Sequence, residues 1–241
     1  MFYVGTSGYS YAEWKGSFYP EKLSPKKFLS FYANEFRSVE INNTFYRLPS
    51  TALTGGWASE VPENFRFVLK ASQSITHFGR LRDVESACKR FFEAHAALKE
   101  RRGPILFQLP PNFKADKVLL EEFLGTIPKD ILTVWEFGNK GWQTDEIYSL
   151  LSDHNASLCI VDDEKKGTPF VETCNFGYAR LRRVEYTDQS IDAWAKKFES
   201  AKWKDAFIFF KHEDAGTGPK LAKRLLASLG EEQPAFSLSL S

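Results

Sequence analysis

Short runs of apolar residues recur along the chain, each about the length of a β-strand. They are rich in Val, Ile, Leu and Phe and end at polar or turn-forming residues, which is typical of strands buried on both faces. The predicted strands are FYVG (2–5), VEIN (39–42), FRFVLKA (65–71), ILFQL (105–109), LTVWEF (132–137), SLCIVDD (157–163), GYARL (177–181) and AFIFFK (206–211).

Most segments between these runs repeat apolar residues at helical spacing. The residues 51–62 differ, because they carry a Gly-Gly pair inside what should be a helix. The residues 164–176 show no helical periodicity, so we expect a loop in place of the sixth helix. The predicted helices are 25–36, 84–100, 117–127, 146–154, 190–201 and 219–230.

Strands that alternate with helices form parallel sheets with right-handed crossovers. Eight such units in 241 residues fit a closed (β/α)8 barrel better than an open doubly wound sheet. No linker or internal repeat divides the chain. We therefore predict an α/β fold with one domain over residues 1–241: a parallel, eight-stranded TIM-like barrel with irregular second and sixth helical units.

Nearly every predicted strand carries a polar residue near its C-terminal end. In a parallel barrel these ends converge on one mouth, where active sites of this architecture lie. Buried charges there must pair with each other or meet a ligand. The alternative is that they form salt bridges that only hold the strands in register. The residues concerned are Thr6, Ser7, Glu40, Asn42, Lys70, Gln108, Glu136, Asp162, Asp163, Arg180, Arg182 and Lys211.

Two loop features add candidates for ligand binding. The loop 212–222 places Gly216 and Gly218 before Pro219, at the start of a predicted helix, where free N–H groups could hold an anion. An ordinary helix entry that contains glycine is the alternative. Aromatic residues in the loops after the strands could line an organic-ligand pocket or simply pack a lid. These are Tyr9, Tyr11, Trp14, Tyr46 and Trp142.

Composition and charge limit the kinds of binding partner that we expect. The chain has 32 Lys plus Arg against 31 Asp plus Glu, so a large nucleic-acid footprint or a polybasic membrane anchor is not expected. The three cysteines lack metal-type spacing, and no apolar stretch approaches membrane-spanning length, so we expect a cytoplasmic protein without a membrane partner. No cofactor is required. A divalent metal stays an alternative, held by Glu40, Glu136 and Asp162 with His77 or His212.

Four sequence blocks resemble the YecE-like family, known as domain of unknown function 72. They are GTSGYSYAEWKGSFYP (5–20), VEINNTFYRLP (39–49), FRFVLKASQSITH (65–77) and ILFQLPPNF (105–113), and the match runs over nearly the whole chain. The resemblance implies a TIM barrel with a pocket at its C-terminal mouth and no established reaction. It implies pocket-lining positions at Ser7, Tyr9, Trp14, Glu40, Asn42, Phe45, Tyr46, Lys70, His77, Gln108, Pro110, Glu136, Trp142, Asp162 and Arg180.

The second half departs from the family pattern. Where the family tends to read EFRHxSW, this chain has Gly138 and Asn139 in place of the arginine and histidine. Where the family tends to read RLHG, this chain continues from Arg180 to Arg182 and Arg183, and Lys211 replaces the first asparagine after the last strand. Three interpretations are open: an altered chemistry, a different ligand, or a transfer of the same positive charges to other strands. We favour the last, which would preserve an anion-binding pocket.

The first functional hypothesis is an enzyme that acts on a small phosphate- or carboxylate-bearing substrate, with phosphoester hydrolysis as the reaction class. Glu40 or Glu136 would be the general base, Lys70 or His77 the acid or electrostatic stabiliser. The alternative is a non-catalytic barrel that binds a ligand or the end of a nucleic acid, which the balanced charge disfavours. A third hypothesis is a Schiff-base enzyme that uses Lys70. The sequence does not indicate the oligomeric state.

Overall fold

Eight parallel strands form the centre of the molecule. A computed structural model describes residues 1–164, 167–212 and 216–231. The strands are β1 (Phe2–Thr6), β2 (Ser38–Ile41), β3 (Arg66–Lys70), β4 (Arg102–Leu109), β5 (Thr133–Phe137), β6 (Ser157–Asp162), β7 (Phe176–Leu181) and β8 (Asp205–Phe210). Their hydrogen-bonded order is β1-β8-β7-β6-β5-β4-β3-β2. The predicted barrel is confirmed, with small shifts at the strand ends.

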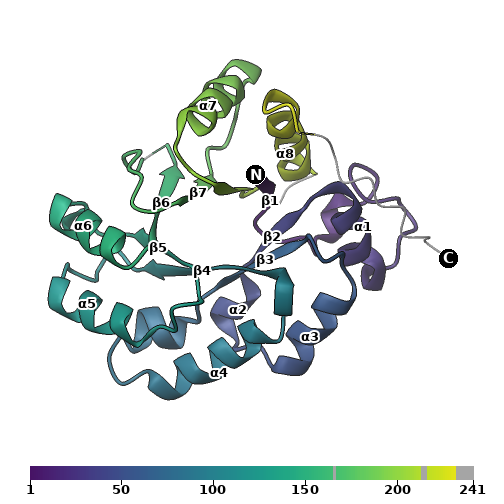
Figure 1. Ribbon diagram of the computed structural model, residues 1–241. Helices are drawn as coiled ribbons and strands as arrows, with labels where there is room; N and C mark the ends of the chain where they lie inside the picture. Colours follow the sequence, from purple (N-terminus) through teal and green to yellow (C-terminus); the bar gives the residue numbers. More distant parts are fainter. Residues whose placement is uncertain (165–166, 213–215, 232–241) are drawn as a thin grey trace.

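Helices surround these strands on the outside (Figure 1). They are α1 (Phe28–Glu35), α2 (Asn43–Tyr46), α3 (Thr51–Ser59), α4 (Glu85–Ala96), α5 (Lys117–Thr126), α6 (Asp145–Asp153), α7 (Asp188–Ser200) and α8 (Thr217–Ser228). Within the described part of the chain, no helix combines the length and apolarity that crossing a membrane requires.

The two units that we expected to be irregular behave differently. The Gly-Gly pair lies inside α3, whose first turn is capped because Ser50 Oγ accepts a hydrogen bond from Leu53 N–H at 3.2 Å. The helix persists because Thr54 and Ala58 are buried on its inner face. The unit is unusual only in having the short helix α2 before it. Between β6 and β7, the described residues 163–164 and 167–175 form no helix, as expected.

Hydrophobic side chains form two layers because neighbouring residues of a strand point to opposite faces of the sheet. The outward residues, such as Val39, Leu69 and Phe107, pack under the helices. The inward residues, such as Val68 and Phe209, fill the barrel. The barrel interior is therefore a packed core, and the polar side chains at the C-terminal ends of the strands lie above it.

The barrel closes between β1 and β2 through a backbone bridge, in which Gly8 N–H donates to Glu40 O at 2.8 Å, and through a side chain. The buried Tyr32 hydroxyl of α1 accepts a hydrogen bond from Thr6 N–H at 2.8 Å and donates one to Ser38 O at 3.1 Å. Gly5 permits this approach, since a Cβ there would lie 2.1 Å from Ser38 O and 2.8 Å from the Tyr32 hydroxyl. This closure holds the end of β1 beside the end of β2.

Candidate functional site

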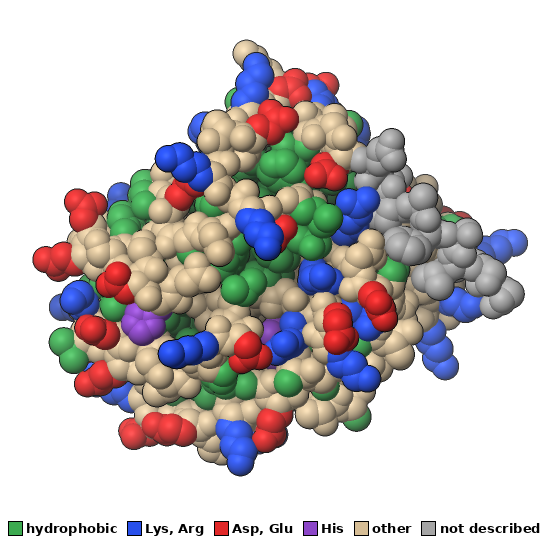
Figure 2. All heavy atoms as spheres, viewed as in Figure 1, with side chains coloured by type: hydrophobic (Ala, Val, Ile, Leu, Met, Phe, Trp, Pro, Cys, Tyr) green, Lys and Arg blue, Asp and Glu red, His purple; other side chains and the backbone are tan. Residues whose placement is uncertain are grey.

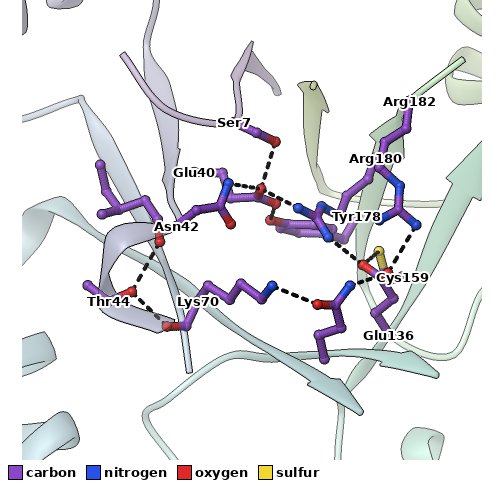
Figure 3. Close-up of polar contacts among 12 residues, drawn as sticks. Ser7, Glu40, Asn42, Thr44, Lys70, Glu136, Cys159, Tyr178, Arg180 and Arg182 are labelled. Atoms are coloured by element: carbon purple, nitrogen blue, oxygen red, sulfur yellow. Dashed lines mark hydrogen bonds and ion pairs between the residues drawn. The ribbon is translucent and has the colours of Figure 1, made fainter. Parts of the chain in front are cut away.

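The inward side chains at the C-terminal ends of five strands form one hydrogen-bonded network. The five residues are Glu40 (β2), Lys70 (β3), Gln108 (β4), Glu136 (β5) and Arg180 (β7). Figure 3 shows these parts of the chain converging, although Glu40 and Arg180 are 140 positions apart in the sequence. The structure thus brings together residues that the strand-end pattern identified.

Glu40 is fully buried and has a partner on each side. Its Oε1 accepts hydrogen bonds from Ser7 Oγ at 2.7 Å and Asn42 Nδ2 at 3.2 Å, and its Oε2 accepts one from Tyr178 Oη at 2.6 Å. The Arg180 guanidinium lies 2.9 Å from Oε1. Burial acts to raise the pKa of Glu40, but Arg180 and the hydrogen bonds from Tyr178 and Ser7 together outweigh it, so the pKa is lowered.

Glu136 is bound in the same way from the other side of the network. Arg180 Nη1 lies 2.7 Å from its Oε2, while Arg182 Nη2 at 3.0 Å and Gln108 Nε2 at 2.6 Å both reach its Oε1. Burial opposes ionisation here too, but Arg180 and Arg182 lower the pKa of Glu136 to about 2.

Arg180 therefore bridges two carboxylates from opposite sides of the barrel, as Figure 3 shows. Both carboxylates are ionised and fully engaged at neutral pH. A general base works best when its pKa lies near the working pH. The expectation that Glu40 or Glu136 serves as general base thus conflicts with the geometry, and both residues instead hold the site in place.

Lys70 is the cation of the network that has no carboxylate partner among the described residues. Its Nζ donates to Gln108 Oε1 at 2.6 Å and lies 4.1 Å from the centre of the Phe45 ring. Gln108 cannot turn its amide around easily, because its Nε2 donates to Glu136. Burial and the nearby Arg180 lower the pKa of Lys70 to about 8, although Glu136 and Glu40 act in the opposite direction.

A pocket of about 250 Å³ opens beside this network, at the ends of β4 to β7. Its polar lining includes Gln108, Glu136 and Arg182, and Arg182 keeps 21% of its side chain exposed. The full lining is His77, Gln108, Leu109, Pro110, Pro111, Glu136, Phe137, Gly138, Lys140, Gln143, Val161, Gly167, Thr168 and Arg182.

A larger groove of about 900 Å³ lies on the outer surface between α4 and α5. Apolar side chains such as Phe92 and Phe123 line it, with charged side chains around them. It is separated from the strand ends and from the network of Glu40 and Glu136, so we do not place the functional site there.

Asp162 does not belong to the network, contrary to our expectation. Cys159 and Val161 of β6 point into the barrel, so Asp162 points outward toward α7. There its carboxylate accepts hydrogen bonds from Arg183 Nε at 2.7 Å and Trp194 Nε1 at 2.9 Å. Asp162 therefore ties β6 to the loop after β7 and to α7.

The predicted aromatic residues separate into two groups. Trp14 and Trp142 are fully buried, and Trp142 Nε1 donates a hydrogen bond to Phe113 O at 2.8 Å. Both residues therefore pack the wall of the barrel, whereas we had expected them to face the opening. Tyr9 packs against Tyr32 of α1 and is outside the pocket lining. Tyr46 is exposed at the end of α2 and stays accessible to a ligand.

The glycine loop before α8 has a packing explanation. Gly216 has φ 78° and a Cβ there would lie 2.5 Å from Ser17 Oγ, while a Cβ at Gly218 would lie 2.9 Å from His212 O. The residues 213–215 of this loop lie outside the described residues. Lys211, just before the loop, is exposed, and its charge contributes to the lowered pKa of Lys70.

Metal binding has no support in the described residues, since no three His, Cys, Asp or Glu side chains gather there in a way that could hold an ion. Glu40 and Glu136 are joined by Arg180, and Asp162 faces away from them. His77 lies with its ring 4.8 Å from that of Phe45 and lines the same pocket as Glu136. The ligand set considered from the sequence is therefore not assembled.

Two network residues escaped the sequence reasoning. Tyr178 donates to Glu40, and Cys159 lies with its Sγ 3.9 Å from Glu136 Oε2. Both look like ordinary core residues, yet Tyr178 is two positions before Arg180 on β7 and must face the same way. That parity is the signal that could have identified it.

Comparison with known proteins identifies the family. The family model described as "Protein of unknown function DUF72" matches residues 3–240. The chain belongs to the DUF72 family. UPF0759 protein YunF of Bacillus subtilis (strain 168) is 24% identical to this DUF72 chain over 273 residues, which cover 96% of each. UPF0759 protein YecE of Escherichia coli (strain K12) is 30% identical over 129 residues, 53% of this chain and 45% of that protein.

Solved DUF72 structures have the same fold. A DUF72 family protein of Thermotoga maritima superposes with a TM-score of 0.77 at 27% identity, over 96% of this chain and all of the other. One from Enterococcus faecalis gives a TM-score of 0.78 at 20% identity, over 96% of both chains. The family resemblance drawn from the sequence is confirmed.

Proposed function

We propose that this DUF72 chain is an enzyme that acts on a small anionic substrate at the C-terminal mouth of its barrel. The observation that carries the proposal is the charge of the network. Glu40 and Glu136 are both paired, and three cations, Arg180, Arg182 and Lys70, surround them. One positive charge is left over, and a phosphate or carboxylate group would neutralise it.

Unused hydrogen-bond donors support an anionic ligand. The Nε atoms of Arg180 and Arg182 are buried and have no partner within the described part of the chain. Arginine offers five N–H donors, and an unmatched donor in a buried place is unfavourable. Arg182 borders the 250 Å³ pocket, so we assign it the role of anchoring the anion.

The lowered pKa of Lys70 favours an enzyme over a simple binding protein. A lysine that only attracts anions works best when it is fully charged, whereas a pKa of about 8 leaves Lys70 able to gain or lose a proton near neutral pH. Figure 2 shows Lys, Arg, Asp and Glu side chains mixed over the viewed face, which fits a small ligand better than a long polyanion.

Isothermal titration calorimetry with inorganic phosphate and with malonate tests the anion site. We expect both to bind, and Arg182→Gln to weaken them by roughly ten- to a hundredfold, because a charge-assisted hydrogen bond contributes about 1.5–3 kcal/mol. Lys129→Gln, an exposed lysine at the opposite end of the barrel before β5, is the control and should bind like the wild type. Equal binding by Arg182→Gln and wild type would contradict the proposal.

A further inference from the structure

We propose that Lys70 is a nucleophile that forms a Schiff base with a small anion carrying a ketone or aldehyde carbonyl, such as a 2-oxo carboxylate. The inference rests on the proposed function and narrows its substrate class. It makes Lys70 a catalytic residue, whereas Glu136 and Gln108 become positioning residues that hold its amine.

The contacts of Lys70 differ from those of a structural lysine. Both nearby carboxylates are occupied by arginines, so among the residues that the structure describes the Lys70 ammonium is bound by the neutral Gln108 amide and the Phe45 ring alone. Because Glu136 fixes the direction of the Gln108 amide, the amine is held in one place without being neutralised. Such a group can leave its partner and react at a moderate energetic cost.

The surroundings keep part of the Lys70 amine uncharged. Burial, Arg180 and Lys211 favour the neutral amine, and Glu136 and Glu40 oppose them, with a resulting pKa of about 8 against 10.5 for an ordinary lysine. The lowered pKa leaves more of the Lys70 amine neutral at pH 7 than in a lysine with the ordinary pKa. A desolvated lysine beside another cation is a known way to activate an amine nucleophile.

The reaction needs no oxidant or metal. The nitrogen lone pair of Lys70 attacks the carbonyl carbon, the carbonyl oxygen takes up a proton, and the nitrogen releases one. The resulting carbinolamine takes up a second proton on its hydroxyl group and then loses water to give the protonated imine. His77 is placed to carry these protons, since its ring contacts the same Phe45 ring as Lys70 and lines the pocket. Lys70 lies behind the pocket lining and meets it through Gln108, and Arg182 of the same lining would hold the substrate carboxylate.

Reductive trapping tests the inference. The protein is incubated with pyruvate and cyanoborohydride, and the site of the adduct is mapped by peptide mass spectrometry. We expect modification of Lys70 at least about tenfold faster than of the exposed Lys129, because a carboxylate bound in the neighbouring pocket would hold the carbonyl close to this amine. Lys70→Met should lose this adduct. Acetone, which has the carbonyl but no carboxylate, should react much more slowly.

The outcomes separate the two proposals. Phosphate binding without a pyruvate adduct at Lys70 would overturn the Schiff base and leave the anion site standing. Loss of both would overturn both. Modification of the wild type spread evenly over its exposed lysines would also overturn the inference, and this readout does not depend on whether Lys70→Met folds.

Discussion

Replacing Arg180 by leucine would leave a charge buried without its counterion. In Arg180→Leu, Glu136 keeps Arg182, but Glu40 retains only the neutral donors Ser7, Asn42 and Tyr178. Breaking a buried ion pair by removing one partner typically destabilises a protein by about 3–5 kcal/mol. The pairing of Glu136 gives a similar scale, because lowering its pKa from 4.5 to about 2 corresponds to about 3 kcal/mol.

The pH dependence of stability should change sign in this variant. In the wild type the pKa values of both carboxyls are lowered on folding, so their contribution is present above pH 4.5 and is lost as the pH falls toward 2. In Arg180→Leu, burial without the guanidinium raises the pKa of Glu40 above its unfolded value. The variant should therefore gain stability when the pH falls from 7 to 5.5, whereas the wild type should not.

Urea denaturation followed by tryptophan fluorescence at pH 7 and pH 5.5 measures both effects. Arg224→Leu is a matched control, because Arg224 also joins two carboxylates, Asp188 and Asp192, but on an exposed surface where such pairs contribute about 0–1 kcal/mol. Adding Glu40→Gln to Arg180→Leu removes the stranded charge and should recover stability at pH 7. Equal destabilisation by Arg180→Leu and Arg224→Leu, or no gain in the stability of Arg180→Leu between pH 7 and pH 5.5, would contradict this prediction.

Two further predictions concern the closure between β1 and β2. Tyr32→Phe should lower the free energy of unfolding by about 1–3 kcal/mol, because Thr6 N–H would be left buried without its acceptor; an unchanged urea midpoint would contradict this. Gly5→Ala should lower the free energy of unfolding by about 1–3 kcal/mol or more, since the added Cβ would collide with Ser38 O. Gly55→Ala is the control, because a Cβ there meets open space and should stabilise α3 by about 0.5–1 kcal/mol. Thermal unfolding of both variants checks the contrast.

The barrel was predictable because its evidence is repeated along the chain. Each strand is a short apolar run, and each inward polar residue keeps the alternation of its strand, as Glu40 does between Val39 and Ile41. The prediction that Asp162 faces the mouth was wrong because Asp162 is the last residue of β6, where polarity alone does not distinguish an inward from an outward side chain. Counting parity from Cys159 would have placed it outside the barrel.

Packing could not be predicted in the same way. The aromatic residues Trp14 and Trp142 follow strands at the mouth, but their burial depends on contacts with distant partners such as Phe113. Whether an aromatic residue in a loop faces a ligand or the wall is decided by tertiary structure. Tertiary structure also decides how the charges pair. This pairing lowers the pKa of Glu40 and Glu136, which disfavours both residues as a general base.

The departures at Gly138 and Asn139 follow from the loop after β4. A Cβ at Gly138 would lie 2.7 Å from Pro111 N, and Asn139 Nδ2 donates to Pro111 O at 2.8 Å, so this loop lies directly against the end of β5. An arginine side chain at position 138 would displace it and change the pocket that it lines. The cations beside Glu136 are Arg180 of β7 and Arg182 just after this strand, whose Nη2 lies 3.0 Å from Oε1. The expected transfer of charge between strands stays a prediction; in this chain the partly exposed Arg182 guanidinium lies at the border of the pocket.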